Sequence, residues 1–188
     1  MSLEKITHPQ MIVLNKVVRD TLKECNSVTL LVRGTSMYPI LFPGDRVIVT
    51  RVDFQNVRTG DIIVFEGRAD VFTHRVIKTT RGALLSKGDN SIFPDPPITD
   101  RNLMGKVTAY ERNGRQIPLS GKMEVMNVFL GYCHLAVGIV GQISQTVLRF
   151  TRGRYRRFFF WMARSLLTVV HLIERILLYG NRIEKSNP

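Results

Sequence analysis

The sequence predicts a mainly β domain with an amphipathic helix before it and two helices after it. Between about residues 28 and 118, short runs rich in Val, Ile and Phe alternate with turn-forming segments, a spacing typical of a compact all-β domain. Before and after this stretch, apolar residues recur every three or four positions, which is the helical period. We therefore expect an N-terminal helix within residues 1–27, a β-rich domain over 28–120 and a helical, basic tail over 121–188.

The N-terminal region carries one amphipathic helix, from about Pro9 to Glu24. Pro9 fits the first turn, where its missing N–H costs nothing. No long apolar run follows, so this end resembles neither a secretory signal nor a membrane anchor. The apolar positions that define the helical face are Met11, Leu14, Val18 and Leu22.

Short turns separate the predicted strands. The segments PGD, TGD, TRG and KGDN are turn signals because Gly adopts positive φ at little cost and Asp can hydrogen bond to its own local backbone. Asp45 and Asp61 are interpreted as such turn residues, and the three prolines of SIFPDPPITD predict an extended loop. The strand runs are VTLLVR, DRVIVTRV, DIIVF, DVFTHRVIK, GALLSK and LMGKVTAYE.

The charge of the chain requires an acidic partner. The 188 residues carry a formal charge of +12, and residues 145–188 hold nine Arg or Lys against two Glu. Nucleic acid and anionic lipid are the usual partners of such a surface. Cys25 and Cys133 form neither a metal-binding motif nor a disulfide framework, so we expect buried or free thiols and no metal or cofactor.

Two helical stretches in the tail favour lipid over nucleic acid. Residues 123–148 are long enough to cross a bilayer, but polar side chains and three glycines make their hydrophobicity marginal. Residues 158–179 combine an apolar face and a Phe158–Trp161 cluster with internal charges, which favours a helix lying in the interface. We expect membrane association, at the cell membrane and on a side that the sequence leaves open, with surface attachment favoured over a span by residues 123–148. No nucleic acid is expected.

Four sequence blocks carry the chemistry. They are GTSMYPILFPGDRVIV (34–49), TGDIIVF (59–65), THRVI (73–77) and KGDN (87–90), with Asp95 six residues after Asp89. In this order they resemble type I signal peptidases, over about residues 28–106. The resemblance implies the β fold of that family and a serine endopeptidase that cleaves a precursor or signal peptide at the membrane. Bacterial members have Lys at the position of His74, whereas the endoplasmic-reticulum and archaeal branch has His. In this respect the chain resembles the latter branch.

Ser36 and His74 are the expected nucleophile and general base. A serine hydroxyl needs a nearby base, and an imidazole can take its proton near neutral pH. In an extended strand Phe72, His74 and Val76 share one face, so His74 points with apolar side chains. A histidine in that position is a satisfied core group or a functional one, and the four-block pattern favours function.

The remaining site residues follow from the resemblance. Asp89 and Asp95 are the candidates for orienting His74, the alternative being that each only shapes a turn or loop, and the sequence leaves open which one contacts it. The Ser36 backbone N–H is the first expected oxyanion donor. Gly34 stands where many members have a second hydroxyl, so Thr35 is the nearest candidate donor. The resemblance also implies that a peptide or preprotein substrate binds as an added strand.

Two other interpretations remain. A self-cleaving repressor-type peptidase shares the Gly-X-Ser-Met pattern, but it needs Lys at position 74 and an N-terminal helix-turn-helix, for which one helix before Val28 is too short. A catalytically inactive β-module could instead tether a peptide partner to a membrane through the basic tail. The sequence identifies neither the natural substrate nor the oligomeric state.

Overall fold

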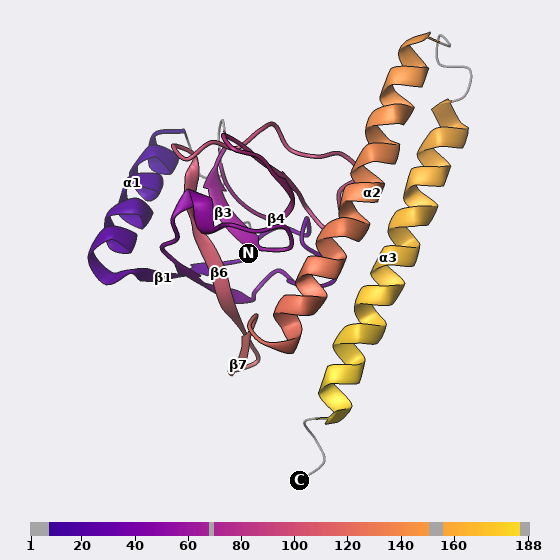
Figure 1. Ribbon diagram of the computed structural model, residues 1–188. Helices are drawn as coiled ribbons and strands as arrows, with labels where there is room; N and C mark the ends of the chain where they lie inside the picture. Colours follow the sequence, from indigo (N-terminus) through magenta and orange to yellow (C-terminus); the bar gives the residue numbers. More distant parts are fainter. Residues whose placement is uncertain (1–7, 68–69, 151–155, 185–188) are drawn as a thin grey trace.

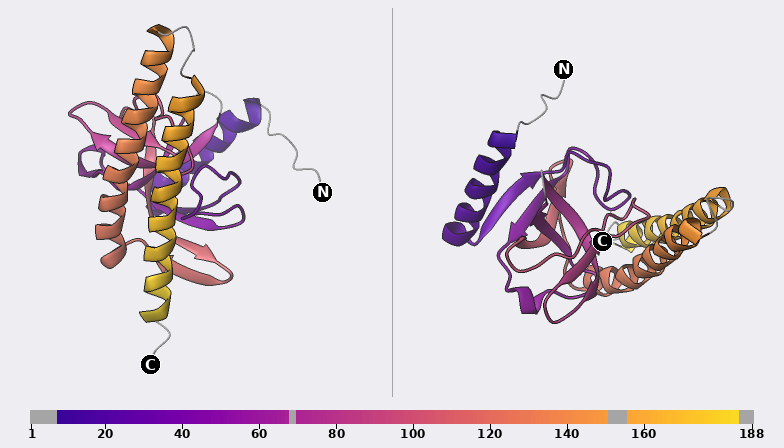
Figure 2. Two further views of the ribbon diagram at one scale, coloured as in Figure 1. Left: turned by 90° about the vertical axis from the view of Figure 1, so that its right-hand side faces the viewer. Right: turned by 90° about the horizontal axis from the view of Figure 1, so that it is seen from above.

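The protein is an antiparallel β-domain with helices on two sides. The computed structural model describes residues 8–67, 70–150 and 156–184 (Figure 1). Helix α1 (His8–Cys25) lies on one side of the β-domain, and helices α2 (Lys122–Phe150) and α3 (Arg156–Glu184) run side by side along the other (Figures 1 and 2). The expected fold class is therefore confirmed.

All strands join one sheet in the order β1-β2-β6-β3-β4-β5, with β7 paired to β6, and every pairing is antiparallel. The long strand β6 is central because it pairs with β2, β3 and β7. The strands are β1 (Ser27–Leu31), β2 (Arg46–Thr50), β3 (Ile62–Glu66), β4 (Val71–Thr79), β5 (Leu84–Lys87), β6 (Leu103–Arg112) and β7 (Arg115–Pro118), with a short 3₁₀ turn at Phe54–Asn56 between β2 and β3.

Among the strands of the described residues, β7 is the one that the pattern of apolar runs did not predict. Asn113 and Gly114 both have positive φ (53° and 72°) and form the two-residue turn that joins β6 to β7. An Asn-Gly pair is the strongest local signal for such a hairpin, so the information was present in the sequence.

The PGD and TGD turns also contain a glycine with positive φ, as expected. Gly44 and Gly60 have φ of 97° and 98°, and the Asp after each accepts a backbone N–H from three residues earlier. The two carboxylates also reach β6, where Asp45 pairs with Arg112 and Asp61 with Lys106. These turns therefore fix the ends of β2 and β3 to the central strand.

The main hydrophobic core holds the segment after Ser36 in place. Met37, Ile40 and Leu41 are fully buried and pack in one cluster with side chains from the sheet, α1 and α2. From α1 the cluster includes Val18 and Leu22, as the helical pattern predicts; the side chains of Met11 and Leu14 lie outside the described residues. Ser36 thus stands at the edge of a rigid core.

Helix α2 packs closely on the β-domain. A Cβ at Gly60 would lie 2.5 Å from the carbonyl oxygen of Asn127, and one at Gly138 would lie 3.1 Å from Pro94. Helix α3 packs on α2 through Val137, Leu167 and Val170. By length and composition Lys122–Thr146 could cross a membrane, but here its inner face is buried against the β-domain.

Candidate active site

Three of the residues predicted from the sequence meet beside the sheet. The Nε2 atom of His74 lies 3.0 Å from Ser36 Oγ, and its Nδ1 atom lies 2.7 Å from Asp95 Oδ2. Ser36 belongs to the turn after β1, His74 to the middle of β4, and Asp95 to the loop after β5. The fold therefore joins segments 21 and 38 residues away from His74 into one hydrogen-bonded chain.

This geometry suits proton transfer. A carboxylate that accepts from Nδ1–H leaves Nε2 free to accept the serine proton, and it stabilises the imidazolium that forms. Asp95 is itself held by the Ser86 hydroxyl, which donates to Oδ2 at 2.6 Å, and by its own N–H, which donates to the Ser86 carbonyl. The rings of Phe65 and Phe72 pack around His74, which is 5% exposed, as expected for a histidine on an apolar strand face.

Gly88 lets the next loop close over this group. A Cβ there would lie 2.7 Å from the Ser36 carbonyl oxygen and 3.1 Å from His74 Nε2, so only glycine fits without displacement. The following loop is fixed from both sides, because Asn90 N–H donates to the Ser36 carbonyl and Lys87 Nζ donates to the carbonyls of Gly88 and Ser91. The KGDN block thus supports the serine turn.

The expected oxyanion donors remain available. Within the part of the chain that the structure describes, neither the Ser36 N–H nor the Thr35 hydroxyl makes a hydrogen bond. Thr35 is exposed, and its carbonyl accepts from the Asn90 side chain at 3.3 Å. Both donors stay predictions.

Asp89 lies in a different cluster and does not contact His74. Its two carboxylate oxygens accept from Nε and Nη2 of Arg75, each at 2.8 Å, and both side chains are fully buried. Arg75 also donates to the Gly60 carbonyl and to Asn127 Oδ1 on α2. Burial, the largest single influence, would raise the pKa of Asp89, but the charge and hydrogen bonds of Arg75 together with the nearby His134 and Lys87 keep that pKa below its ordinary value. Of the two candidate carboxylates, the structure brings only Asp95 to the imidazole.

The two tail helices complete this buried cluster. His134 Nε2 on α2 lies 2.8 Å from Glu174 Oε1 on α3 and 3.3 Å from Asp89 Oδ1. Burial lowers the pKa of His134 to about 3, and burial together with the charge of Asp89 raises the pKa of Glu174 to about 9. Burial also lowers the pKa of the neighbouring Lys87 to about 8. The cluster therefore holds both tail helices against the β-domain through polar contacts closed to water.

Asp89, His134 and Glu174 are the described residues whose ligand atoms could surround a metal ion. Arg75 already occupies both oxygens of Asp89, and the Lys87 ammonium adds a second positive charge nearby. A divalent cation would meet both charges in a site closed to water, where repulsion is strongest. We therefore interpret the cluster as a structural hydrogen-bonded network around the Arg75–Asp89 ion pair.

Helix α3 touches the loops on both sides of Ser36. His171 Nε2 lies 3.0 Å from the Asp89 carbonyl oxygen, so it donates to the KGDN loop. Arg175 donates to the Tyr38 hydroxyl in the segment after Ser36. The helix thus forms one wall beside the candidate nucleophile.

Comparison with known proteins agrees with this arrangement. A family model described as Peptidase S24-like matches residues 4–108, more than half of the chain. The chain belongs to the Peptidase S24-like family. This membership supports a serine-type peptidase or self-cleaving fold in general, so the coarse part of the sequence resemblance is confirmed. The finer assignment to the endoplasmic-reticulum and archaeal branch of signal peptidases stays a prediction, and no curated protein matches the chain.

Sequence reasoning missed the residues of the buried cluster. His134 and Glu174 stood out only as polar interruptions of apolar helices, and Arg75 only as part of the THRVI block. A usable signal existed, because a charged side chain inside an otherwise apolar helix needs a buried partner. Two such helices could have been paired on that argument with Asp89, which the sequence resemblance instead indicated as a candidate partner of His74.

Proposed function

We propose that this protein is a serine endopeptidase in which Ser36 is the nucleophile, His74 the general base and Asp95 the residue that orients it. The observation that carries the proposal is the pair of contacts on one imidazole, 3.0 Å to the Ser36 hydroxyl and 2.7 Å to the Asp95 carboxylate. Both lie within the reach expected of a nucleophile, its base and its orienting group.

The proposed reaction is acyl transfer. His74 Nε2 takes the Ser36 proton as Oγ attacks the scissile carbonyl, and the Ser36 N–H, assisted by Thr35, stabilises the oxyanion. The imidazolium then gives its proton to the departing amine as the C–N bond breaks. Water, deprotonated by the same imidazole, hydrolyses the acyl-enzyme and regenerates Ser36.

The free edge of β4 supports a polypeptide substrate. Residues 71–75 of β4 pair with β3 on one side, but pairing with β5 begins only at Arg75. Among the strand pairings of the described residues, the other edge of Val71–His74 is therefore open, directly beside His74. An extended peptide that added there would bring its backbone to Ser36 by strand addition.

The open edge of β4 also argues against the self-cleaving alternative. In a self-cleaving peptidase a segment of the chain itself must reach the nucleophile, yet no described strand pairs with the edge of Val71–His74 that faces away from β3. Position 74 also carries His and not Lys. We therefore favour cleavage of a separate polypeptide.

We further propose that the protein works at a membrane surface, as a signal-peptidase-type enzyme acting on a precursor. Most of the exposed large apolar side chains of the described residues lie on α2 and α3, and the basic tail residues complement anionic lipid. Because the inner face of α2 packs on the β-domain, attachment by the outer faces suits this arrangement better than a span. This outer apolar face consists of Val125, Val128, Phe129, Tyr132, Ile139 and Ile143 on α2, and Phe158, Trp161, Val169, Leu172 and Ile176 on α3.

The peptidase chemistry is tested by labelling and cleavage together. A fluorophosphonate probe should label the native chain at Ser36, and the chain should cleave a precursor inserted in anionic vesicles. Ser36→Ala and His74→Ala should lose both activities, whereas Ser27→Ala, at an exposed serine of β1, should keep them. Labelling that persists in Ser36→Ala, or cleavage that persists in both site variants, contradicts the assignment.

Membrane attachment can be measured through the fluorescence of Trp161. Trp161 is the single tryptophan of the chain and is 69% exposed on the outer face. Its fluorescence should shift to shorter wavelength with vesicles containing phosphatidylglycerol, and the double variant Leu172→Ser, Ile176→Ser should need several times more lipid for the same shift. Val13→Ser, at an exposed apolar residue of α1, is the matched control. An unchanged emission spectrum with excess vesicles contradicts attachment by this face.

A further inference from the structure

A pocket between α3 and the loop after β5 lies next to the turn that carries Ser36. Its volume is about 380 Å³, and the α3 side is formed by Arg164, Leu167, Thr168 and His171, the loop side by residues 90–93. Asn90 at its edge donates its N–H to the Ser36 carbonyl. The pocket therefore adjoins the backbone of the turn that carries the candidate nucleophile.

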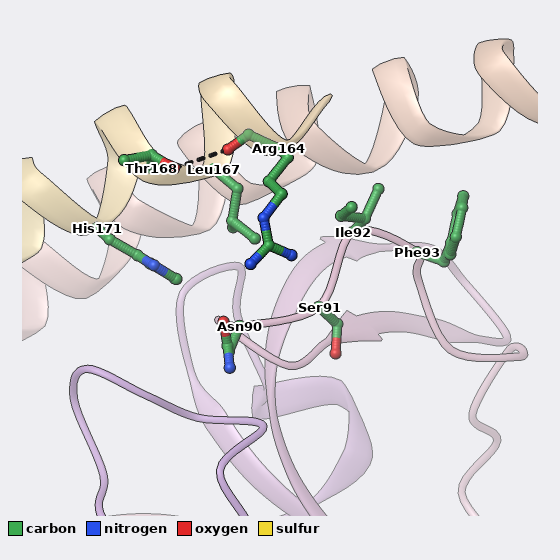
Figure 3. Close-up of a pocket in the computed structure, with 8 residues that line it drawn as sticks. All are labelled: Asn90, Ser91, Ile92, Phe93, Arg164, Leu167, Thr168 and His171. Atoms are coloured by element: carbon green, nitrogen blue, oxygen red, sulfur yellow. Dashed lines mark hydrogen bonds between the residues drawn. The ribbon is translucent and has the colours of Figure 1, made fainter. Parts of the chain in front are cut away.

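Arg164 gives this pocket its charge. Figure 3 shows the Arg164 side chain extending from α3 toward the loop, between His171 and Ile92. Within the described residues its guanidinium makes no hydrogen bond or ion pair; only its backbone carbonyl is used, by the Thr168 hydroxyl. An exposed guanidinium that faces a cavity with all its donors free is suited to bind a carboxylate through two parallel hydrogen bonds.

The surrounding charges favour an anion. The carboxylates nearest to the pocket are already occupied, since Asp89 is paired with Arg75 and Asp95 contacts His74. Glu174 is buried and holds its proton at neutral pH, because its pKa is raised to about 9. Lys87 lies beneath the loop, with its ammonium on the carbonyls of Gly88 and Ser91. Positive charge thus dominates this side of the site.

The position of Arg164 on the helix favours a peptide over a lipid. Arg164, Thr168, His171 and Arg175 follow each other at spacings of three or four residues and form one stripe, which faces the Ser36 and KGDN loops. The exposed apolar residues Val169, Leu172 and Ile176 also follow each other at spacings of three or four and form a neighbouring stripe on the same helix. A bilayer against the apolar stripe would therefore leave Arg164 turned toward the catalytic loops.

We infer that this pocket is a specificity subsite that takes an Asp or Glu side chain of the substrate, bound by Arg164, at a position flanking the scissile bond. The inference rests on the proposed function, since it names a preference of that same site. The apolar floor formed by Leu167 and Ile92 suits the methylene groups of such a side chain, and Thr168 and Asn90 offer further polar contacts at the edge.

A random-sequence peptide library tests the inference. The native chain should cleave peptides enriched in Asp or Glu at one fixed position near the cleaved bond, by about tenfold over Asn or Gln at that position. Arg164→Gln should lose this enrichment while keeping its rate of fluorophosphonate labelling at Ser36 and its thermal midpoint. Arg81→Gln, at an exposed arginine in the turn between β4 and β5, is the matched control and should behave as the native chain.

The outcomes separate this inference from the proposed function. If Ser36 does not react with the probe and nothing is cleaved, the proposed function fails and the subsite fails with it. If the native chain cleaves the library without acidic preference, if the preference survives in Arg164→Gln, or if Ser36 reacts but no free peptide is cleaved, only the subsite fails. If Arg164→Gln instead loses binding to phosphatidylglycerol vesicles and keeps the peptide preference, the pocket binds lipid phosphate and the inference is overturned.

Discussion

Two histidines in the described part of the chain contact carboxylates, and their surroundings are opposite. His74 has Asp95 on one nitrogen and the Ser36 hydroxyl on the other, and the Asp95 side chain is 20% exposed. His134 has Glu174 and Asp89 on one nitrogen, whereas its buried Nδ1 has no partner among the described residues. The difference teaches that a histidine–carboxylate contact is not by itself a catalytic signature. What the second nitrogen faces decides whether a proton can be passed on.

The largest expected effect separates the two histidines directly. His74→Gln should lower the rate of Ser36 labelling at least about a thousandfold, because it removes the base. His134→Gln should keep the rate within about fivefold, since His134 does not contact Ser36, and should act on stability instead. Stopped-flow labelling of the two variants under identical conditions makes the comparison. Equal losses of labelling rate in His74→Gln and His134→Gln would show that the two histidines do not differ in role.

For the two aspartates, substitution of Asp89 should mainly reduce stability and substitution of Asp95 should mainly reduce the labelling rate. Asp89→Asn leaves the fully buried Arg75 without its charged partner, which costs about 3–5 kcal/mol of the free energy of unfolding. Urea unfolding followed by circular dichroism measures this loss. Asp100→Asn, at an exposed loop position, serves as the control and should unfold as the native chain does. A variant at position 89 with native stability would contradict the structural role of the cluster.

Asp95→Asn should reduce the labelling rate about a hundredfold or more, because an amide favours the wrong tautomer of His74. Stability should change much less than in Asp89→Asn, since the Asp95 carboxylate is partly exposed. Labelling rate and urea midpoint are measured on the same preparation. A large loss of stability with an unchanged rate would exchange the roles that we give to the two aspartates.

The smallest effect concerns pH. Folded Glu174 keeps its proton up to about pH 9, whereas an unfolded glutamate releases it near 4.5. Between these values the folded state binds more protons, so the stability from this group is complete below pH 4.5 and declines as the pH rises toward 9. Glu174→Gln should remove this decline. Urea midpoints from pH 7 to 8, above the range where His134 adds an opposite trend and below that of Lys87, should fall for the native chain relative to the variant. Parallel curves would refute this effect of Glu174.

Much of the fold could be predicted because its signals are local. Alternating apolar runs and Gly-Asp turns located six strands, and β7 escaped only because the Asn113–Gly114 turn was not used. Ser36 and His74 could be proposed because motif order and strand periodicity act within short segments. The choice between Asp89 and Asp95 could not be made, since both follow the same strand and only the path of the loop decides which one turns toward His74.

The contacts of the tail helices could not be predicted from the sequence for a related physical reason. A helical pattern indicates which face is apolar but not what will cover it, so α2 and α3 were expected to face lipid as a separate region. The inner faces instead pack on the β-domain through Asn127, His134 and Glu174, while only the outer faces stay exposed. Long-range pairing of buried charges depends on the assembled fold and leaves no periodic trace in the sequence.

The family match ends at residue 108, but the packed structure does not. Asn127 and His134 shield the Arg75–Asp89 pair from one helix, and Glu174 seals it from the next. A fragment cut at the family boundary would expose this pair to water and strip the hydrophobic cover from the serine turn. The isolated amino-terminal half, expressed alone, should therefore be unstable. A transfer of this domain to another protein should include α2 and α3 together with the sheet.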